Sequence, residues 1–540
     1  MIVCVPPLTG KFWPTLGPQV CDFIEETLTF GPGDLLGQPA QLDDEKRSLI
    51  YRMYEVYPKG HSLAGRRRFK RVAISLRKGS AKTEFAAWLA ITELHPAGPV
   101  RCTGWTKKGD PIGGPVMDPY IPMVAYTEEQ SEELAYGAMR IILENSTVAQ
   151  DFDIGLERIM RVSGYGKAEA LATAPSSRDG ARTTFQHFDE THHMSLPRLK
   201  KAHRAMLANI PKRRLADAWS LETTTAPAPG EFSVAEDTME YAEEVRRGKI
   251  KDPTLFFFHR QASDKHDLTK ARGLRAAVKE ASGPVAKWSD LKGIIDQWND
   301  PKADKAWLER VWLNRLVRSA EQAFDIQAWK KAEKRRYTVE DGALITLGFD
   351  GARTQDATAI VATEVETGYQ WPLGVWQRPH TAKVWEVPHL EVKEAMTDAF
   401  TRWDVWRLYA DPPYWETTVA EWSAEFGEER VVAWRTASTR KMADAVRAFA
   451  NGIADGDLTH APDPVFEFHI GNAHRRYVSV RDEKGEQLWT IYKERSDSPK
   501  KIDVAMAAIL SWEARRDSIA KGASKEAEPS VYETRGILTV

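Results

Sequence analysis

Hydrophobic positions in the first half of the chain fall into short apolar runs followed by longer amphipathic stretches. The run "FKRVAISL" at 69–76 is rich in β-branched residues and precedes a helical pattern that must end near Pro96. "IPMVAYTEEQSEELAYGAMRIILEN" repeats this order, with Thr127 and Gln130 at capping-box spacing. Two more strands are expected in "TTFQHFDE" and "AWSLETTTAP". Strands that alternate with helices predict an α/β fold with a parallel, doubly wound sheet.

The pattern changes in the second half. Residues 231–335 are helical and charged, as in "DKAWLERVWLNRLVRSAEQAF", and predict a helical lid and linker. "ALITLGFDGARTQDATAIVATEVETGYQWPLGVWQ" then contains three β-rich runs, which predict a meander that opens a new domain. A helix near 391–403, the strand "WRLYAD", a helix from about 416, the hairpin "YVSVRDEKGEQLWTIYKE" and the helix "KIDVAMAAILSWEARR" are expected to follow.

The length of 540 residues predicts two to four domains, at roughly 150 residues each. The expected boundaries are an N-terminal adaptor at 1–60, a first α/β domain at 61–230, the lid and linker at 231–335, a second domain at 341–516 and a mobile tail at 517–540.

Composition narrows the class of protein. A hydrophobic content of 42% with 28% charged residues is typical of globular domains, and a net charge of -2 argues against a surface built throughout for polyanions. Cys4, Cys21 and Cys102 are too far apart for a disulfide framework or a C-x-x-C metal pair, which predicts a reducing cytoplasm. Without an apolar run of 18 residues, the chain is expected to be neither exported nor membrane-spanning.

"SLRKGSAKTE" at 75–84 resembles a phosphate-binding loop, G-x-x-x-x-G-K-[ST], in which Leu76 and Ala81 replace the two glycines. Gly79, with the small Ser80, still permits a tight path at a helix N-terminus. The lysine would reach the β/γ oxygens of ATP and the threonine would bind Mg²⁺. The alternative is a surface turn with a solvated basic face. The residues expected to bind ATP are Arg77, Gly79, Ser80, Ala81, Lys82, Thr83 and Asp189.

"FDE" at 188–190 supplies partners for this loop. Asp189 would hold the Mg²⁺ through water, and Glu190 would orient and deprotonate the attacking water. An ATPase is therefore expected. A zinc site is the alternative for the neighbouring histidines, although no H-E-x-x-H spacing supports it; its ligands would be His187, His192 and His193.

Two further features are candidates for a role in hydrolysis. Arg178, with Arg182 as its rival, could reach the γ-phosphate of a neighbouring subunit, whereas an ordinary surface arginine is the alternative. Thr223, Thr224 and Thr225 could couple hydrolysis to motion through hydroxyl contacts, or they could simply favour the strand.

Three acids in the second domain predict a metal nuclease. Asp350 and Asp411 end strands, and Asp503 lies on the final helix among apolar residues, where an unpaired acid would be costly. Two strands and a helix that converge in this way suit a two-metal phosphodiesterase. Asp356, across the turn into the next strand, is a candidate fourth ligand or an acid that supports the ligands from behind. For each acid alone the alternative is a turn residue or a helix cap.

With both sites in view, the chain resembles the large terminase subunit of tailed bacteriophages, a DNA-packaging motor. The resemblance runs from about residue 40 to 516. It departs from the family at Ala81 and at the adenine-contacting glutamine, for which Gln41 is a weak candidate. The motifs that carry it, in order, are "SLRKGSAKTE", "FDETHH", "TTT", "GFDGARTQDATAIV", "WPLGVWQRP", "YADPPYW", "HIGNA" and "KIDVAMAA".

The resemblance implies an ASCE-type P-loop ATPase, a helical lid and an RNase H-like nuclease. Lys82 and Thr83 would bind phosphate and Mg²⁺, Asp189 and Glu190 would be the Walker B pair, and Arg178 would be the arginine finger. Asp350, Asp411 and Asp503 would hold two divalent ions, Mg²⁺ or Mn²⁺, at the nuclease site.

The resemblance also implies partners. These are double-stranded DNA, the portal protein of the procapsid, a small terminase subunit and further copies of the chain in a ring, all in the cytoplasm of an infected bacterium. Two alternatives remain: an RNase H-like recombinase or transposase with a fused ATPase, and a DNA translocase whose nuclease domain is inactive.

Overall fold

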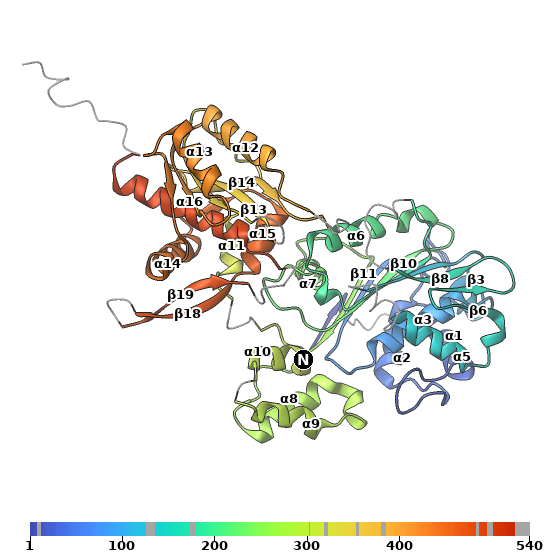
Figure 1. Cartoon of the computed structure of the whole chain (residues 1–540). Helices are drawn as coiled ribbons and strands as arrows, with labels where there is room; N and C mark the ends of the chain where they lie inside the picture. The colour runs from blue at the N-terminus through green and yellow to red at the C-terminus, as the bar shows by residue number, and fades with distance from the viewer. Residues whose placement is uncertain are drawn as a thin grey trace, which may run out of the picture. The chain divides into compact units, whose positions relative to one another are not determined.

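The computed structural model describes residues 1–7, 12–125, 135–171, 180–301, 303–317, 322–352, 356–379, 385–481, 485–493 and 500–523. The chain forms two compact units, Met1–Ser319 and Ala320–Val540 (Figure 1). No helix among the described residues combines the length and the apolar character needed to cross a membrane.

The first unit is built on a nine-stranded sheet. In spatial order its strands are β1 (Ile2–Val5), β11 (Leu255–Arg260), β2 (Arg71–Ser75), β10 (Trp219–Thr224), β9 (Phe185–Asp189), β5 (Tyr120–Val124), β8 (Lys167–Leu171), β7 (Arg158–Arg161) and β6 (Phe152–Ile154). All neighbours from β11 to β8 pair in parallel, and antiparallel strands complete the two edges. The predicted parallel sheet is confirmed. A separate hairpin joins β3 (Arg101–Trp105) to β4 (Pro111–Gly114).

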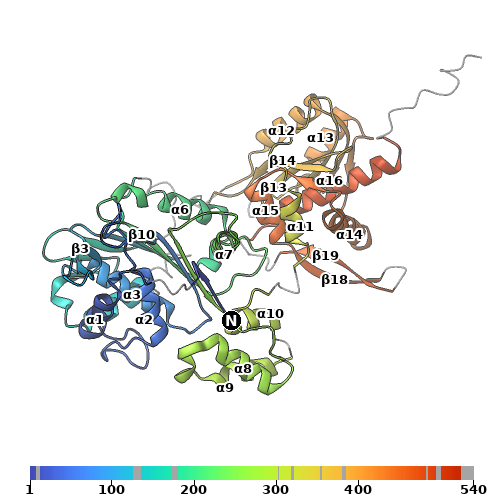
Figure 2. The same cartoon turned by 180° about the vertical axis from the view of Figure 1, so that it is seen from behind.

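Helices cover both faces of this sheet (Figure 2). One face carries α1 (Gly17–Thr27), α2 (Asp44–Met53), α3 (Lys82–Leu94) and α5 (Ala135–Glu144), and the other carries α6 (Pro197–Leu207) and α7 (Val234–Arg246). On β2, Val72 and Ile74 join the core around α3, whereas Ala73 packs with Ala242 of α7. Burial on both faces explains why β2 is a continuous apolar run rather than an alternating one.

Two predicted boundaries of the first domain are wrong. β11 lies inside 231–335, where a helical lid and linker were expected, and β1 lies inside the expected adaptor at 1–60; both belong to the sheet. β11 is buried along its whole length, so its side chains do not alternate and give no strand period.

A helical subdomain, residues 271–313, does form within the expected lid. Its helices are α8 (Ala271–Ser282), α9 (Leu291–Asp296) and α10 (Lys305–Leu313). They pack around a small core of their own that includes Leu274, Ala277 and Leu313.

The second unit contains a six-stranded sheet. Its spatial order is β16 (Val431–Ala433), β15 (Asp404–Ala410), β12 (Leu344–Asp350), β13 (Thr358–Glu364), β14 (Tyr369–Trp376) and β17 (Thr459–His460). The meander β12-β13-β14 is antiparallel, as predicted, and β15 runs parallel to β12. The carboxyl ends of β12 and β15 therefore meet at one edge of the sheet.

Helices again cover both faces. α12 (His389–Arg402) and α13 (Glu416–Phe426) pack on one face, and α16 (Asp503–Ala520) crosses the other (Figure 1). A side chain at Gly348 would lie 2.0 Å from the Ala507 carbonyl oxygen, so glycine is required where α16 crosses β12. α16 also extends into the tail expected from 517. The remaining elements are α11 (Ile326–Ala332), α14 (Thr439–Asp455), α15 (Pro464–Gly471) and the predicted hairpin of β18 (His474–Arg481) and β19 (Gln487–Tyr492).

Candidate functional sites

The loop between β2 and α3 has the backbone path of a phosphate loop. Gly79 has φ 71°, and Ala81, the residue before α3, has φ 54° and ψ 39°. Both are left-handed, a conformation that costs an alanine about 1–2 kcal/mol and glycine very little. Ala81 thus keeps the conformation that glycine favours, and the N–H groups at the start of α3 face the loop.

Lys82 closes the loop from inside. Its Nζ donates hydrogen bonds to the carbonyl oxygens of Leu76 and Arg77, each at 3.0 Å. Burial lowers the pKa of Lys82 to about 8, and the carboxylates of Asp189 and Glu190 offset this only in part. A bound anion would restore the charge of this amine.

The loop is bonded directly to the end of β9. The Thr83 hydroxyl donates to Oδ2 of Asp189 at 2.8 Å, and the Thr223 hydroxyl donates to Oδ1 at 2.7 Å. Asp189 is fully buried, and Glu190 after it is half-buried with a left-handed φ of 48°. β10, which carries Thr223, lies between β2 and β9. The sheet therefore brings together the loop, the acidic pair and the threonine run.

The threonines also contact the histidines of the alternative zinc site. Thr223 lies 2.8 Å from His187 Nε2, Thr224 accepts from the His192 backbone N–H at 3.1 Å, and Thr225 lies 3.2 Å from His192 Nε2. Burial lowers the pKa of both histidines. His187 and His192 thus form hydrogen bonds with hydroxyl groups of the protein. The three threonines contact residues at the end of β9 and just after it.

Arg77 takes a place that the sequence did not predict. Its guanidinium is buried and donates to the hydroxyls of Ser282 and Ser289, each at 2.6 Å, and to the Lys78 carbonyl oxygen at 2.5 Å. The two serines belong to α8 and to the segment before α9. Arg77 therefore joins the loop to the helical subdomain, which differs from the direct ATP contact expected from sequence.

Asn314, at the end of α10, ties the helical subdomain to three strand ends. Its amide nitrogen donates to Ser75 Oγ at 3.1 Å and to the Arg260 carbonyl oxygen at 2.8 Å, and its amide oxygen accepts from the Ala226 N–H at 2.7 Å. Asn314 has a left-handed φ of 53°. No motif marks this residue in the sequence, because its partners come from three distant segments.

Two buried polar atoms beside the loop have no partner among the residues that the structure describes. They are the Ser80 hydroxyl and Nε of Arg310. Arg310 precedes Val311, whose carbonyl oxygen accepts from the Lys78 N–H at 2.8 Å. Arg310 also acts with Lys82 and Lys78, after burial and His193, to lower the pKa of His192. These atoms suit an anionic ligand.

Five residues singled out in the sequence have no observed contact with this site within the described part of the chain. Arg178 lies outside the described residues, as do Thr127 and Gln130. Arg182 and Gln41 are exposed.

The predicted carboxylates meet in the second unit. Asp350 ends β12, Asp411 follows β15 and donates its backbone N–H to the Phe349 carbonyl oxygen at 3.1 Å, and Asp503 begins α16. Burial, followed by Asp503, Asp411 and Asp356, raises the pKa of Asp350 well above its usual value. Burial, followed by Asp356, raises the pKa of Asp503 to about 6. Asp350 and Asp503 are thus destabilised as carboxylates by burial and by the neighbouring acids.

Two of the four acids are bonded to other side chains of the second unit. Asp411 accepts from the hydroxyl of Thr436 and, at 3.2 Å, from its N–H. Asp356 accepts from Lys493 at 2.5 Å and from Lys501 at 2.8 Å. Within the described ranges, no three acidic, histidine or cysteine side chains form a complete metal site. The donor chemistry fits a hard cation, and Asp356, expected as a fourth acid or as one behind the ligands, is ion-paired to two lysines.

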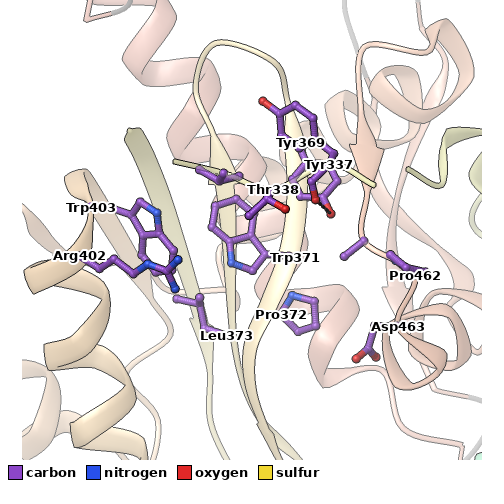
Figure 3. A pocket seen from close by; sticks show the side chains of 12 residues that line it. Tyr337, Thr338, Tyr369, Trp371, Pro372, Leu373, Arg402, Trp403, Pro462 and Asp463 are labelled. Carbon is purple, nitrogen blue, oxygen red and sulfur yellow. Dashed lines mark hydrogen bonds between the residues drawn. The ribbon is translucent and has the colours of Figure 1, made fainter. Parts of the chain in front are cut away.

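A cavity of about 420 Å³ lies elsewhere in the second unit (Figure 3). Figure 3 shows Arg402 and Trp403 on one side of Trp371, and Pro462 and Asp463 on the other. Trp371 pairs with Ala362, near the end of β13 remote from Ala359, the partner of Asp350. The cavity is therefore separate from the carboxylate site.

Comparisons with known proteins found relatives over most of the chain. The chain is 26% identical over 513 residues to the gene 13 protein of Mycobacterium phage D29, covering 88% of this chain and 83% of that protein. It is 24% identical over 514 residues to the gene 13 protein of Mycobacterium phage L5, covering 88% and 84%. No protein-family profile matches the chain.

Similar solved structures include three large terminases. The HK97 bacteriophage large terminase covers 93% of this chain and 100% of its own, with a TM-score of 0.48 and 15% identity. The large terminase of a thermophilic bacteriophage covers 85% and 95%, with a TM-score of 0.32 and 10% identity. The large terminase nuclease of the thermophilic phage G20c covers 36% and 98%, with a TM-score of 0.26 and 16% identity.

Proposed function

We propose that this chain is a large terminase subunit of a tailed bacteriophage. In this role, ATP hydrolysis in the first unit moves double-stranded DNA into a procapsid, and the carboxylate site of the second unit cuts the DNA. The observation that carries the proposal is the carboxylate of Asp189, held by Thr83 of the phosphate loop and Thr223 of the neighbouring strand. The acidic site in the second unit supports the nuclease part.

The loop would bind the phosphates of ATP. The N–H groups at the start of α3, the amine of Lys82 and the unpartnered Ser80 hydroxyl provide positive charge and donors for the phosphate oxygens. Arg310 is a further candidate contact from the helical subdomain. Thr83 and Asp189 would hold Mg²⁺, which neutralises charge on the phosphates.

Glu190 would orient and deprotonate the attacking water. Its carboxylate follows β9, next to Asp189, and is half-buried, so it is open to a water molecule beside the loop. Arg178, or its rival Arg182, would stabilise the transition state from a neighbouring subunit.

Thr223, Thr224 and Thr225 would couple hydrolysis to motion. They connect Asp189, His187 and His192 to β10. Asn314 and Arg77 connect the same region to the helical subdomain. Loss of the γ-phosphate would thus change the position of the helical subdomain relative to the phosphate loop.

Asp350, Asp411 and Asp503 would hold two divalent ions, Mg²⁺ or Mn²⁺, which supply an activated water and stabilise the leaving oxygen of the phosphodiester. The chain's own contribution is the placement of these acids by β12, β15 and α16. Burial and the neighbouring acids raise the pKa of Asp350 and of Asp503, so cation binding would be accompanied by loss of protons from these two groups.

The proposed partners are double-stranded DNA, the portal protein of a procapsid, a small terminase subunit and further copies of this chain in a ring. The test is packaging with purified procapsids that carry their portal. Wild-type chain with ATP should convert added DNA into DNase-resistant DNA, and Glu190→Gln chain should not. ATP turnover without protected DNA, together with strand-joined products, would instead identify a recombinase.

A further inference from the structure

Lys493 and Lys501 converge on one oxygen of Asp356. Lys493 Nζ lies 2.5 Å from Oδ1 of Asp356, and Lys501 Nζ lies 2.8 Å from the same oxygen. The three side chains are partly buried, with exposed fractions of 19%, 18% and 33%. Within the described part of the chain, the Asp356 carboxylate has no further hydrogen-bond partner. Oδ1 therefore accepts two hydrogen bonds, and Oδ2 accepts none from the described residues.

The three residues belong to different parts of the second unit. Asp356 lies two residues before β13, Lys493 directly follows β19, and Lys501 lies two residues before Asp503 of α16. The two ion pairs thus fasten the base of the β18–β19 hairpin and the start of α16 to the turn that follows Asp350. Asp356 and Lys501 are each close in sequence to an acid of the carboxylate site, namely Asp350 and Asp503.

The lysines also act on that site electrostatically. The charge of Asp356 raises the pKa of both Asp350 and Asp503, whereas Lys493 lowers the pKa of Asp503. Burial, followed by Lys501, lowers the pKa of His469 to about 3. The neutral His469 ring accepts from the Val504 N–H at 3.1 Å, which holds the first turn of α16.

We propose that Lys493 and Lys501 are positioning residues of the carboxylate site, which hold Asp356 outside direct ligation and offset part of the site's negative charge. This inference rests on the proposed nuclease function. With both lysines in place, Asp356 stays beside the site and does not ligate the metal ions directly. When one lysine is removed, a single ion pair remains on Asp356, and its carboxylate can also ligate a divalent ion in an unproductive arrangement. Metal binding then tightens while cutting slows, the opposite of what simple damage to the site would produce.

The test compares full-length Lys501→Gln and Lys493→Gln with wild type. Each substitution should lower the Kd for Mn²⁺, measured by calorimetry without nucleotide, by about three- to tenfold, because Asp356 then becomes available to ligate the cation. The cutting rate of plasmid DNA at saturating Mn²⁺ should fall about tenfold or more. Lys393→Gln, which removes a surface lysine paired with Glu421, is the matched control and should change neither value. Lys501→Arg should retain wild-type behaviour.

An Asp356→Asn background separates positioning from a general charge effect. If the lysines act through Asp356, Lys501→Gln should give no further tightening in this background. Tightening that persists undiminished, or Kd values that stay unchanged or rise in chains with unaltered thermal unfolding, would overturn the inference.

Asp350→Asn distinguishes this outcome from failure of the proposed function. Mn²⁺ binding that Asp350→Asn abolishes, but that the lysine substitutions do not tighten, contradicts the positioning role alone. Mn²⁺ binding that is absent from wild type or insensitive to Asp350→Asn contradicts both the positioning role and the nuclease assignment.

Discussion

The hydroxyl of Thr83 lies 2.8 Å from Oδ2 of Asp189, although 106 residues separate the two in sequence. Thr83 begins α3 after the phosphate loop, and Asp189 ends β9, which is separated from β2 by β10. This contact places the acidic pair at the loop. The roles of the residues around this contact can be tested by substitution.

Glu190→Gln is expected to bind ATP but hardly hydrolyse it. The substitution removes the base while the loop and Asp189 stay intact, so turnover should fall by about 10²- to 10⁴-fold. Nucleotide binding and phosphate release are measured on the same preparation. Glu244→Gln, which changes an exposed acid of α7, is the control and should leave turnover unchanged. Normal turnover in Glu190→Gln would show that another group activates the water.

Ala81→Gly is expected to preserve ATPase activity and to leave the melting temperature unchanged or raised. The substitution relieves about 1–2 kcal/mol of left-handed strain, and the greater freedom of glycine in the unfolded chain takes back about 0.5–1 kcal/mol. Ala276→Gly, at an exposed position of α8, should instead lose about 1 kcal/mol. A comparable loss at both positions, measured by thermal unfolding, would contradict strain at Ala81.

Asp350→Ala is expected to abolish plasmid cutting that depends on Mg²⁺ or Mn²⁺ and to spare ATP hydrolysis. The two activities use residues of different units, so they should separate completely. Asp341→Ala is the control, because Asp341 is an exposed acid paired with Arg402. Cutting that survives in Asp350→Ala would remove the metal assignment.

Asp503→Asn is expected to stabilise the metal-free chain in a pH-dependent manner. Burial and Asp356 raise the pKa of Asp503 from 3.8 to about 6, so between these values the folded chain holds a proton that the unfolded chain has released. This group therefore makes stability fall as pH rises from about 4 to 6. The advantage of Asp503→Asn in melting temperature should grow over this window and level off above it. An advantage that is constant with pH would show that burial does not raise this pKa.

Asn314→Ala is expected to destabilise the first unit and slow ATP turnover. The substitution leaves buried partners on three strand ends unpaired, at about 1–3 kcal/mol for each unsatisfied group. Turnover should fall more than ATP affinity, because the helical subdomain loosens from the loop. Asn299→Ala, a change at an exposed asparagine of the same subdomain, should have little effect. If the two substitutions lowered the melting temperature equally, Asn314 would not be a specific link between the helical subdomain and the strand ends.

Local sequence predicted much of the fold. The turn between β2 and α3, the acids at the end of β9 and the meander β12-β13-β14 all follow from apolar periodicity and turn chemistry, which act over a few residues. β11 was not predicted because a strand buried on both faces has no alternation of apolar and polar residues. β1 was not predicted because an edge strand of four residues gives little signal.

The sequence by itself determined which chemical groups are present: a lysine and a threonine after a tight loop, an acidic pair at a strand end, and acids on two strands and a helix. Only the tertiary structure decided what each group touches. Arg77 bonds to serines of the helical subdomain, and Asp356 is bonded to Lys493 and Lys501. Such pairs join residues more than a hundred positions apart. They depend on sheet order and helix packing, which local patterns do not encode.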